Sequence, residues 1–444
     1  MTDKPLSRQM WHIALPAIVT NISVPMLGLV DSFIMGHLPD PRYLGAIALG
    51  AMMISLLYNS VNFLRMATTG FTAQAYGGLS QGTEEGDITK IYLRASLLAM
   101  VIGLSFIAIQ IPVADITFFL TSADEGVEKL ARRYFLIRIW GAPFACLNFV
   151  AVGWLLGLHK ARAALWIQLV MNISNILLNF LFVYGLGMDV DGVALGTVLA
   201  EGLAAILAFR LVLCHNRAFS GLALWSREAR HDLFNRREFA RLFALNRDIF
   251  IRTACLTGSM AAFTILGANM GTTLLAANAI LMNLQMVTSY GLDGFAQAAE
   301  VMVGKQIGRR SAAGLRKAVL LSGKWALITA ILFSLIYWLF GEIFIDALTN
   351  IPVVRTTAEH YIIWVIVLPL VSVWSFHLDG IFIGATAGKY MRSGMIISTI
   401  IYAASLVVSL PLWHNHGLWL SYSIFMATRA LTLARAYPDI YPRP

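Results

Sequence analysis

Residues 13–38 read IALPAIVTNISVPMLGLVDSFIMGHL, an apolar run in which Asp31 is the one charged residue. About 20 mostly apolar residues let a helix cross a bilayer, and the apolar core of a signal peptide has only about 7–15. We therefore expect a retained first membrane helix. Similar apolar windows lie at about 11–36, 43–76, 91–112, 133–157, 163–186, 193–214, 249–268, 273–304, 317–340, 358–384, 393–413 and 417–434. They predict an all-α integral membrane protein with twelve transmembrane helices.

The composition agrees with this interpretation. Of the 444 residues, 58% are hydrophobic and 13% are charged, whereas a soluble domain has about 45–50% apolar and about 25% charged residues. This difference excludes a soluble enzyme, a disordered chain and a nucleic-acid-binding protein. The net charge of +9 comes from Lys and Arg in alternate loops, chiefly 214–247 and 304–317. Because positive loops stay in the cytoplasm, we expect both termini to be cytoplasmic.

The two halves of the chain resemble each other. Gly153-x3-Gly157 recurs as Gly380-x3-Gly384, and Gly192 and Gly417 each begin the last apolar window of a half. Six helices per half is an even number, so the repeats would share one orientation in the membrane. We expect an N-terminal lobe of residues 1–214, a cytoplasmic linker of residues 215–247 and a C-terminal lobe of residues 248–444, related by pseudo-symmetry.

The first window contains the most suggestive combination of residues. Pro16 and Pro25 each remove a backbone hydrogen bond from a helix, which makes this helix a candidate moving part with a hinge at either proline. Asp31 follows in the same window, where a charged side chain costs about 2.5–3.5 kcal/mol on insertion scales. Such a carboxylate could take up and release a proton during transport, or hydrogen bonds could hold it in a structural role.

Amides line the fifth window. Gln168, Asn172, Asn175 and Asn179 are spaced by three or four residues, which places them on one helical face. They could bind neighbouring helices, or line a wet cavity and share protons with Asp31. In the sixth window, Thr197 and Glu201 are spaced i, i+4 and could face the same cavity, although Glu201 could instead be a satisfied structural acid.

Three further acids lie in apolar windows of the second half, and they form a second candidate site: Asp293, Glu300 and Asp379. Asp293 and Asp379 could be protonated during transport, or Arg65, Arg138 or Arg252 could hold them in structural ion pairs. Motifs for nucleotide binding, for nucleophilic catalysis and for metal binding are absent from the sequence. An ion gradient, rather than ATP, is therefore the expected energy source, and no metal or cofactor is expected.

Methionine and aromatic side chains can form adaptable linings for lipophilic cations. The chain contains 18 Met and 25 Phe residues, most of which must serve the core and the membrane interface. A weak set of candidates for a substrate cavity joins Asn172 and Glu201 to Met35, Phe63, Met66, Met171 and Met286.

The whole chain resembles the multidrug and toxic compound extrusion (MATE) family, in particular its DinF-like branch. The resemblance rests on the opening run and on NFLRMATTGFTAQAYG (62–77), NISNILLNFLFVYGLG (172–187), GVALGTVLAE (192–201), LDGFAQAAE (292–300) and LDGIFIGAT (378–386). It implies a V-shaped exporter of two six-helix lobes that exchanges H+ or Na+ for organic, often cationic, compounds by alternating access.

The resemblance also assigns roles to residues. It implies that Asp31 is the proton or cation site, that Asn175, Asn179 and Thr197 are its partners, and that Asp379 resembles a coupling acid of other branches. Many relatives carry an aspartate where this chain has Asn179. That difference removes a negative charge, which favours proton coupling over a Na+ site in this lobe.

We therefore expect a monomeric, proton-coupled multidrug antiporter of a bacterial inner membrane, in which protonation of Asp31 bends the first helix and ejects the drug. Its partners would be small organic cations and the lipid bilayer, with H+ as the coupling ion and Na+ as a possible one. The alternatives are a Na+-coupled exporter of the same family and a flippase for lipid-linked substrates, which would need a broad basic cavity. A membrane-embedded enzyme is disfavoured because the sequence lacks a catalytic cluster.

Overall fold

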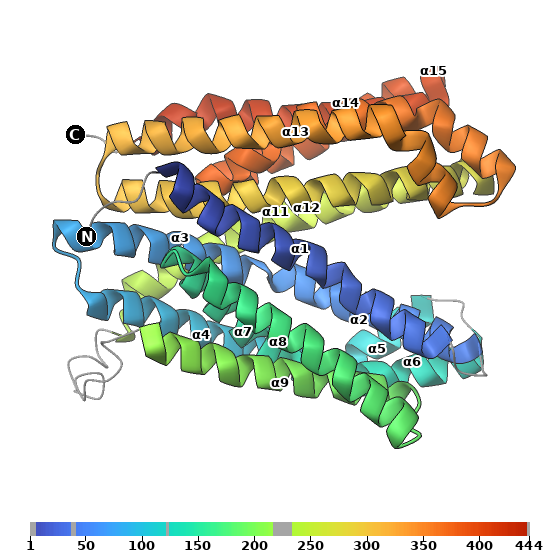
Figure 1. The fold of residues 1–444 in the computed structure, drawn as a ribbon, viewed down its shortest axis with the longest axis horizontal. Helices are drawn as coiled ribbons and strands as arrows, with labels where there is room; N and C mark the ends of the chain where they lie inside the picture. The colour runs from blue at the N-terminus through green and yellow to red at the C-terminus, as the bar shows by residue number, and fades with distance from the viewer. Residues whose placement is uncertain (1–5, 37–40, 121–123, 216–232, 442–444) are drawn as a thin grey trace. The chain divides into compact units, whose positions relative to one another are not determined.

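A computed structural model describes residues 6–36, 41–120, 124–215 and 233–441, and only the backbone of residues 24–33, 35, 36, 41 and 120 within them. Every regular element in these ranges is a helix (Figure 1). Contacts divide the chain into two compact units. We call Val19–Phe243 the N-unit, and Met1–Ile18 together with Ala244–Pro444 the C-unit. The lobe boundaries predicted from the sequence stay a prediction.

The first helix, α1 (Leu6–Gly36), keeps its helical assignment through Pro16 and Pro25. The other N-unit elements are α2 (Pro41–Val61), α3 (Phe63–Gly78), η1 (Leu79–Gln81), α4 (Glu85–Ala108), α5 (Gln110–Leu120), α6 (Glu125–Arg138), η2 (Ile139–Gly141), α7 (Ala142–Gly157), α8 (Ala161–Phe180), the π-helix η3 (Leu181–Gly185) and α9 (Val190–His215). In this unit α8 packs on α9, and α7 packs on α3 and α4.

The remaining elements are α11 (Arg236–Asn269), α12 (Thr272–Gly308), α13 (Ala312–Leu348), α14 (Pro352–Gly384), α15 (Gly388–Ala436) and η6 (Tyr437–Ile440). Inside α15, His414 has a φ of 48° and a ψ of −124°, so two helices meet there at a kink. A reciprocal amide pair holds this kink, because the side chains of Asn278 and Asn415 hydrogen-bond each other at 2.7 and 3.0 Å.

The count of membrane spans is confirmed. Nine stretches of described helix are long and apolar enough to cross a membrane. One of them, Gly388–Ile440, contains the two helices that meet at His414. With α1 and α12, which have 31 and 37 residues, the chain has twelve spans. Two of the predicted windows contain a local break, since α2 ends before Asn62 and α6 ends before η2.

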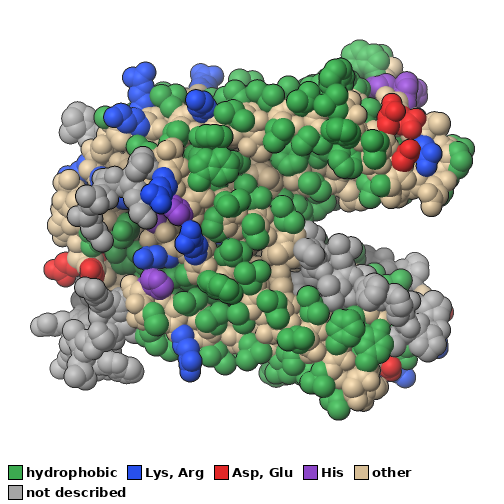
Figure 2. Space-filling model, in the orientation of Figure 1, with side chains coloured by type: hydrophobic (Ala, Val, Ile, Leu, Met, Phe, Trp, Pro, Cys, Tyr) green, Lys and Arg blue, Asp and Glu red, His purple; other side chains and the backbone are tan. Residues whose placement is uncertain are grey.

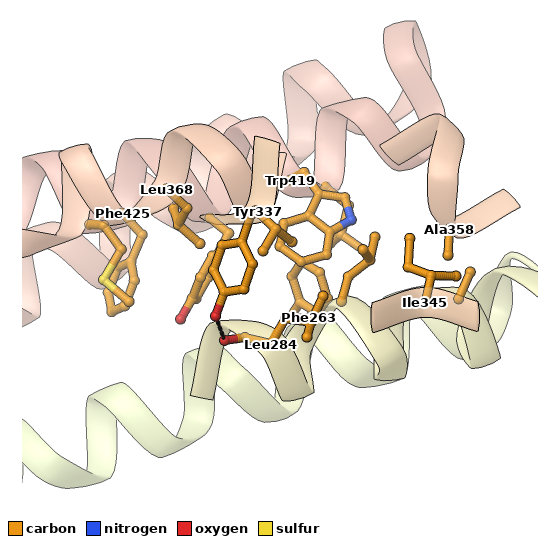
Figure 3. Packing of buried hydrophobic residues seen from close by; sticks show 14 of the residues in the cluster. Phe263, Leu284, Tyr337, Ile345, Ala358, Leu368, Trp419 and Phe425 are labelled. Carbon is orange, nitrogen blue, oxygen red and sulfur yellow. Dashed lines mark hydrogen bonds between the residues drawn. The ribbon is translucent and has the colours of Figure 1, made fainter. Parts of the chain in front are cut away.

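The core of the C-unit is a cluster of aromatic and branched side chains. Phe263 packs edge-on against Trp419, with ring centroids 5.0 Å apart, and the hydroxyl of Tyr337 donates to the carbonyl of Leu284 at 2.8 Å (Figure 3). These residues come from α11, α12, α13 and α15, so the cluster joins most helices of the unit. The N-unit has its own core, which includes Ile34, Ile47, Tyr134 and Phe135.

The repeated glycine pairs serve the same purpose in both units. A Cβ on Gly153 would meet the carbonyl oxygen of Arg65 at 2.4 Å, and one on Gly380 would meet that of Ala296 at 2.1 Å. The second glycines, Gly157 and Gly384, approach the backbone one helical turn further along the same partner helix. Close approach of α7 to α3, and of α14 to α12, therefore requires glycine at equivalent positions. This equivalence is what a duplicated six-helix unit predicts.

Candidate functional site

A buried polar cluster joins α8 and α9 in the N-unit. The Nδ2 atom of Asn175 donates to the hydroxyl of Thr197 at 2.8 Å, and that hydroxyl donates to the carbonyl of Val193 at 2.8 Å. Asn179 donates to the Oδ1 atom of Asn175 at 3.3 Å. Asn175 and Asn179 are completely buried. The structure thus brings together Asn175, Asn179 and Thr197, as the sequence predicted.

A glycine on α9 makes room for this cluster. A Cβ on Gly196 would meet the Oδ1 atom of Asn179 at 2.2 Å. Position 196 therefore has to be glycine for the Asn179 side chain to lie beside Asn175. Gly196 is a positioning residue that was not predicted from the sequence. The spacing Gly192-x3-Gly196 is a signal that could have indicated it.

The line of amides continues from this cluster to α1. Gln168 donates to Asn172 at 2.9 Å, and Asn172 donates to the backbone carbonyl of Ser23 at 3.3 Å. The hydroxyl of Tyr184, at the end of this helix, donates to the carbonyl of Ile34 at 3.4 Å. Helix α8 and its π-helical extension thus hold the second half of α1 at two points. Along the chain, Pro25 and Asp31 fall between Ser23 and Ile34, and Met35 follows Ile34, but the side chains of these three residues lie outside the described residues.

Glu201 has a different environment from the amide cluster. Arg138 forms a two-pronged ion pair with it, at 2.8 Å and 2.6 Å, and both side chains are buried. Arg138 also donates to the hydroxyl of Tyr58 at 3.1 Å and lies over the Tyr58 ring. The side chain of Asn148 donates to the Glu201 backbone carbonyl. Of the two alternatives for Glu201, this geometry is that of a satisfied structural acid.

Two arginines hold Asp379 in the C-unit. The guanidinium groups of Arg252, on α11, and Arg429, on α15, both donate to its Oδ2 atom, the second at 2.6 Å. All three side chains are buried. The ion-pair alternative for Asp379 therefore describes the geometry, with Arg252 among the partners the sequence suggested. Arg429 was missed, although an arginine within an apolar helix is a recognisable signal.

The other acids of this unit lie on α12. Asp293 accepts a hydrogen bond from Gln297 at 2.9 Å and is half-buried, and Glu300 is buried. They are two turns apart on one helix, as the spacing predicted, and Asp379 has its own arginine partners on other helices. The protonation of Asp293 and Glu300 during transport stays a prediction.

The weak candidates for a substrate cavity are distributed over both units. Phe63, Met66 and Met171 are half-buried in the N-unit. Met286 is 42% exposed on α12 in the C-unit. Pro16 is half-buried on the first part of α1. Within the described part of the chain, no group of three or more His, Cys, Asp or Glu residues could hold a metal ion.

Comparison with known proteins adds to this geometry. Residues 16–181 and 249–414 each match the family described as MatE, so the match itself is duplicated. The DNA damage-inducible protein F of Escherichia coli (strain K12) is 40% identical over 432 residues, which cover 96% of this chain and 91% of that protein. The probable multidrug resistance protein NorM of Bacillus thuringiensis subsp. konkukian (strain 97-27) is 24% identical over 94% of this chain and 92% of its own.

Solved structures share the fold. One, described as an outward-facing conformation of a multidrug resistance MATE family transporter of the MOP superfamily, has a TM-score of 0.84 at 18% identity and covers 98% of this chain and 96% of its own. Another, described as MATE in the bent conformation, has a TM-score of 0.86 at 16% identity with the same coverage.

Proposed function

Because the chain belongs to the MATE family, whose members are transporters and not enzymes, we propose that this multi-pass membrane protein is a proton-coupled exporter of lipophilic, often cationic, compounds. It works by alternating access in the inner membrane of a bacterium, as a monomer with both termini in the cytoplasm. Its coupling ion is H+, and Asp31 is the group that carries it.

The observation that supports proton coupling most is the bonding of the amide cluster. The Thr197 hydroxyl both accepts and donates, and the Oδ1 atom of Asn175 accepts from Asn179. The side-chain oxygens of Thr197 and Asn175 are therefore engaged with protein donors, whereas a hard cation is held by several oxygen ligands directed at it. The cluster residues Asn175, Asn179 and Thr197 carry no charge. A Na+ site would be stabilised by a second carboxylate at one of these positions.

The partners of two buried acids, Glu201 and Asp379, support the assignment of the coupling role to Asp31. Glu201 is paired with Arg138, and Asp379 with Arg252 and Arg429. A guanidinium stays charged at all physiological pH values and only donates hydrogen bonds, so it stabilises the ionised carboxylate. An acid that must change its charge in each cycle is better served by the N-unit amides, which Asn172 connects to α1.

The proposed cycle uses the two prolines of α1. In the outward-facing state Asp31 takes a proton from outside, which removes its negative charge from a helix that α8 contacts at Ser23 and η3 contacts at Ile34. Helix α1 then bends at Pro16 or Pro25, the cavity contracts, and the cargo leaves. This coupling requires that the two shapes of α1 differ in their affinity for the proton and for the cargo.

Transport by the purified full-length chain in lipid vesicles tests this proposal. We expect a pH gradient at constant Na+ to drive export of ethidium, and a Na+ gradient at constant pH to drive none. Asp31→Asn should abolish proton-driven export. Asp115→Asn, at an exposed acid paired with Arg132, is the matched control and should transport normally. Unchanged proton-driven export by Asp31→Asn would refute the assignment, and export driven by Na+ alone would identify the Na+-coupled alternative.

A further inference from the structure

An apolar groove runs along the C-unit between α13, α14 and the last part of α15. Its volume is about 710 Å³, within the range of about 300–1,000 Å³ that is usual for sites of small molecules. Its walls include Leu320 and Leu327, Trp374 and Leu378, and Ala427 and Leu431. Leu320 and Leu431 are 63% and 68% exposed. The groove is therefore open at the surface of the unit and not a closed cavity.

At the floor of the groove, two polar side chains hydrogen-bond each other. His377 on α14 is buried and hydrogen-bonds the hydroxyl of Ser322 on α13 at 2.9 Å. Gly323 on α13 lies against the His377 ring, and a Cβ at this position would be only 3.0 Å from the ring. The floor thus presents no polar atom that requires a ligand. An occupant of this part of the groove has to be apolar.

Two cations of α13 lie along the groove and just beyond it. Lys324 lines the groove between Leu320 and Leu327, and Arg316 lies about two turns earlier on α13, beyond the lining residues, on the face that also presents Leu320 and Gly323. The guanidinium of Arg316 is also close enough to the hydroxyl of Tyr437, which lines the groove, to interact with it electrostatically. Figure 2 shows Lys and Arg side chains gathered at this end of α13. The one acid of the adjoining η6 is Asp439, which is exposed.

We propose that this groove binds one anionic phospholipid from the leaflet at the basic end of the unit. An acyl chain would lie between Leu327, Trp374 and Leu431, and the phosphate would lie between Arg316 and Lys324. Basic pockets between transmembrane helices on the cytoplasmic side bind lipid head groups in this manner, and tyrosine side chains such as Tyr437 favour the interface depth. The topology predicted from the charged loops places this end in the cytoplasmic leaflet.

Charge complementarity distinguishes this site from the ordinary lipid contact of a membrane protein. Bulk lipid covers any apolar face without preference for its head group. A groove lined by Lys324, with Arg316 just beyond it on α13, predicts selectivity for a phosphate that carries a net negative charge. Each Lys or Arg near a membrane surface contributes about 1 kcal/mol toward an anionic lipid, so removal of two should weaken binding about 30-fold.

The test is a lipid titration of the purified chain in detergent, with bound lipid counted by native mass spectrometry. Phosphatidylglycerol and phosphatidylcholine with identical acyl chains are the probes. We expect tighter binding of one phosphatidylglycerol, and about 30-fold weaker binding to Arg316→Gln/Lys324→Gln. The matched control, Arg310→Gln/Lys389→Gln, removes an exposed Arg and an exposed Lys of the same unit that do not line the groove, and it should bind like the unmodified chain.

A third variant tests the apolar part without a change of charge. Ala434 is an exposed residue of the groove wall, so Ala434→Trp should fill the groove and displace the lipid while the protein still folds. Equal affinity for the two lipids would overturn the proposal, as would an equal loss in the control variant or undiminished binding by Ala434→Trp. None of these measurements uses transport, so they are independent of the coupling ion.

Discussion

The ion pair between Glu201 and Arg138 provides a direct test of whether a buried acid is structural. Glu201→Gln keeps the shape of the side chain and leaves Arg138 as an uncompensated charge that is 7% exposed. The pair has two hydrogen bonds, at 2.6 and 2.8 Å. Removal of one partner from a buried pair costs about 3–5 kcal/mol. We therefore expect Glu201→Gln to lower the free energy of unfolding by about that amount.

Cys146 offers a reporter for this measurement. Its thiol is completely buried on α7, while Cys214 is exposed and Cys255 is partly exposed. In a Cys214→Ser/Cys255→Ser background, a thiol-reactive dye would label Cys146 only after unfolding. Titration with SDS in mixed micelles then gives the free energy of unfolding. Glu342→Gln, at an exposed acid on α13, is the control and should change this free energy by less than about 0.5 kcal/mol.

The double variant Arg138→Met/Glu201→Met removes both charges of the pair at once. Replacement of both members of a buried pair by apolar residues is often neutral, so most of the stability lost in Glu201→Gln should return. The pH profile of transport per folded molecule should be unchanged in both variants, since the pair does not exchange protons in our account. A normal stability of Glu201→Gln together with a shifted pH profile would refute this reasoning and place Glu201 in the proton pathway.

Three more predictions follow from contacts of single residues. Asp379→Asn leaves Arg252 and Arg429 with a neutral amide, so unfolding in SDS should require about 3–5 kcal/mol less, with the pH profile of transport retained. Gly380→Ala, whose Cβ would meet the Ala296 carbonyl at 2.1 Å, should cost about 1–3 kcal/mol by overpacking in the same titration, whereas Gly258→Ala, which meets nothing within 4 Å, should not destabilise. Asn179→Asp adds a carboxylate beside Asn175, and vesicle transport should become stimulated by Na+.

Much of the fold was predictable because a bilayer imposes simple rules on a sequence. Apolar length gave the number of spans, and the backbone contacts of Gly153 and Gly380 explain why the repeat is visible as glycine pairs. Small residues mark the contacts between helices in membranes. The break at Asn62 was less visible, because a local change of backbone direction leaves the apolar composition unchanged, whereas the kink at His414 falls between the predicted windows 393–413 and 417–434.

The candidate site was predictable along each helix but not between helices. The spacing of Asn172, Asn175 and Asn179 placed them on one face of α8, and their bonds to Ser23 and Thr197 lie on that face. Which arginine meets which acid depends on how distant segments pack. Arg138 was considered as a partner for the acids of the second half, and it pairs instead with Glu201 in its own unit.

Arginine and amide side chains offer different hydrogen-bonding groups to an acid, so an acid held by arginine and an acid beside amides can have different roles. A guanidinium has donors only, so it matches a carboxylate and has no acceptor for a carboxylic acid. Asp379 and Glu201 are held in this way by buried arginines. A side-chain amide has both donors and an acceptor. A cluster such as Asn175 with Asn179 can reverse its hydrogen bonds and serve both protonation states of a neighbouring acid. A coupling acid is therefore best sought beside amides, and helix α8 offers them in two places: Asn179 with Asn175, and Asn172, which donates to the Ser23 carbonyl of α1.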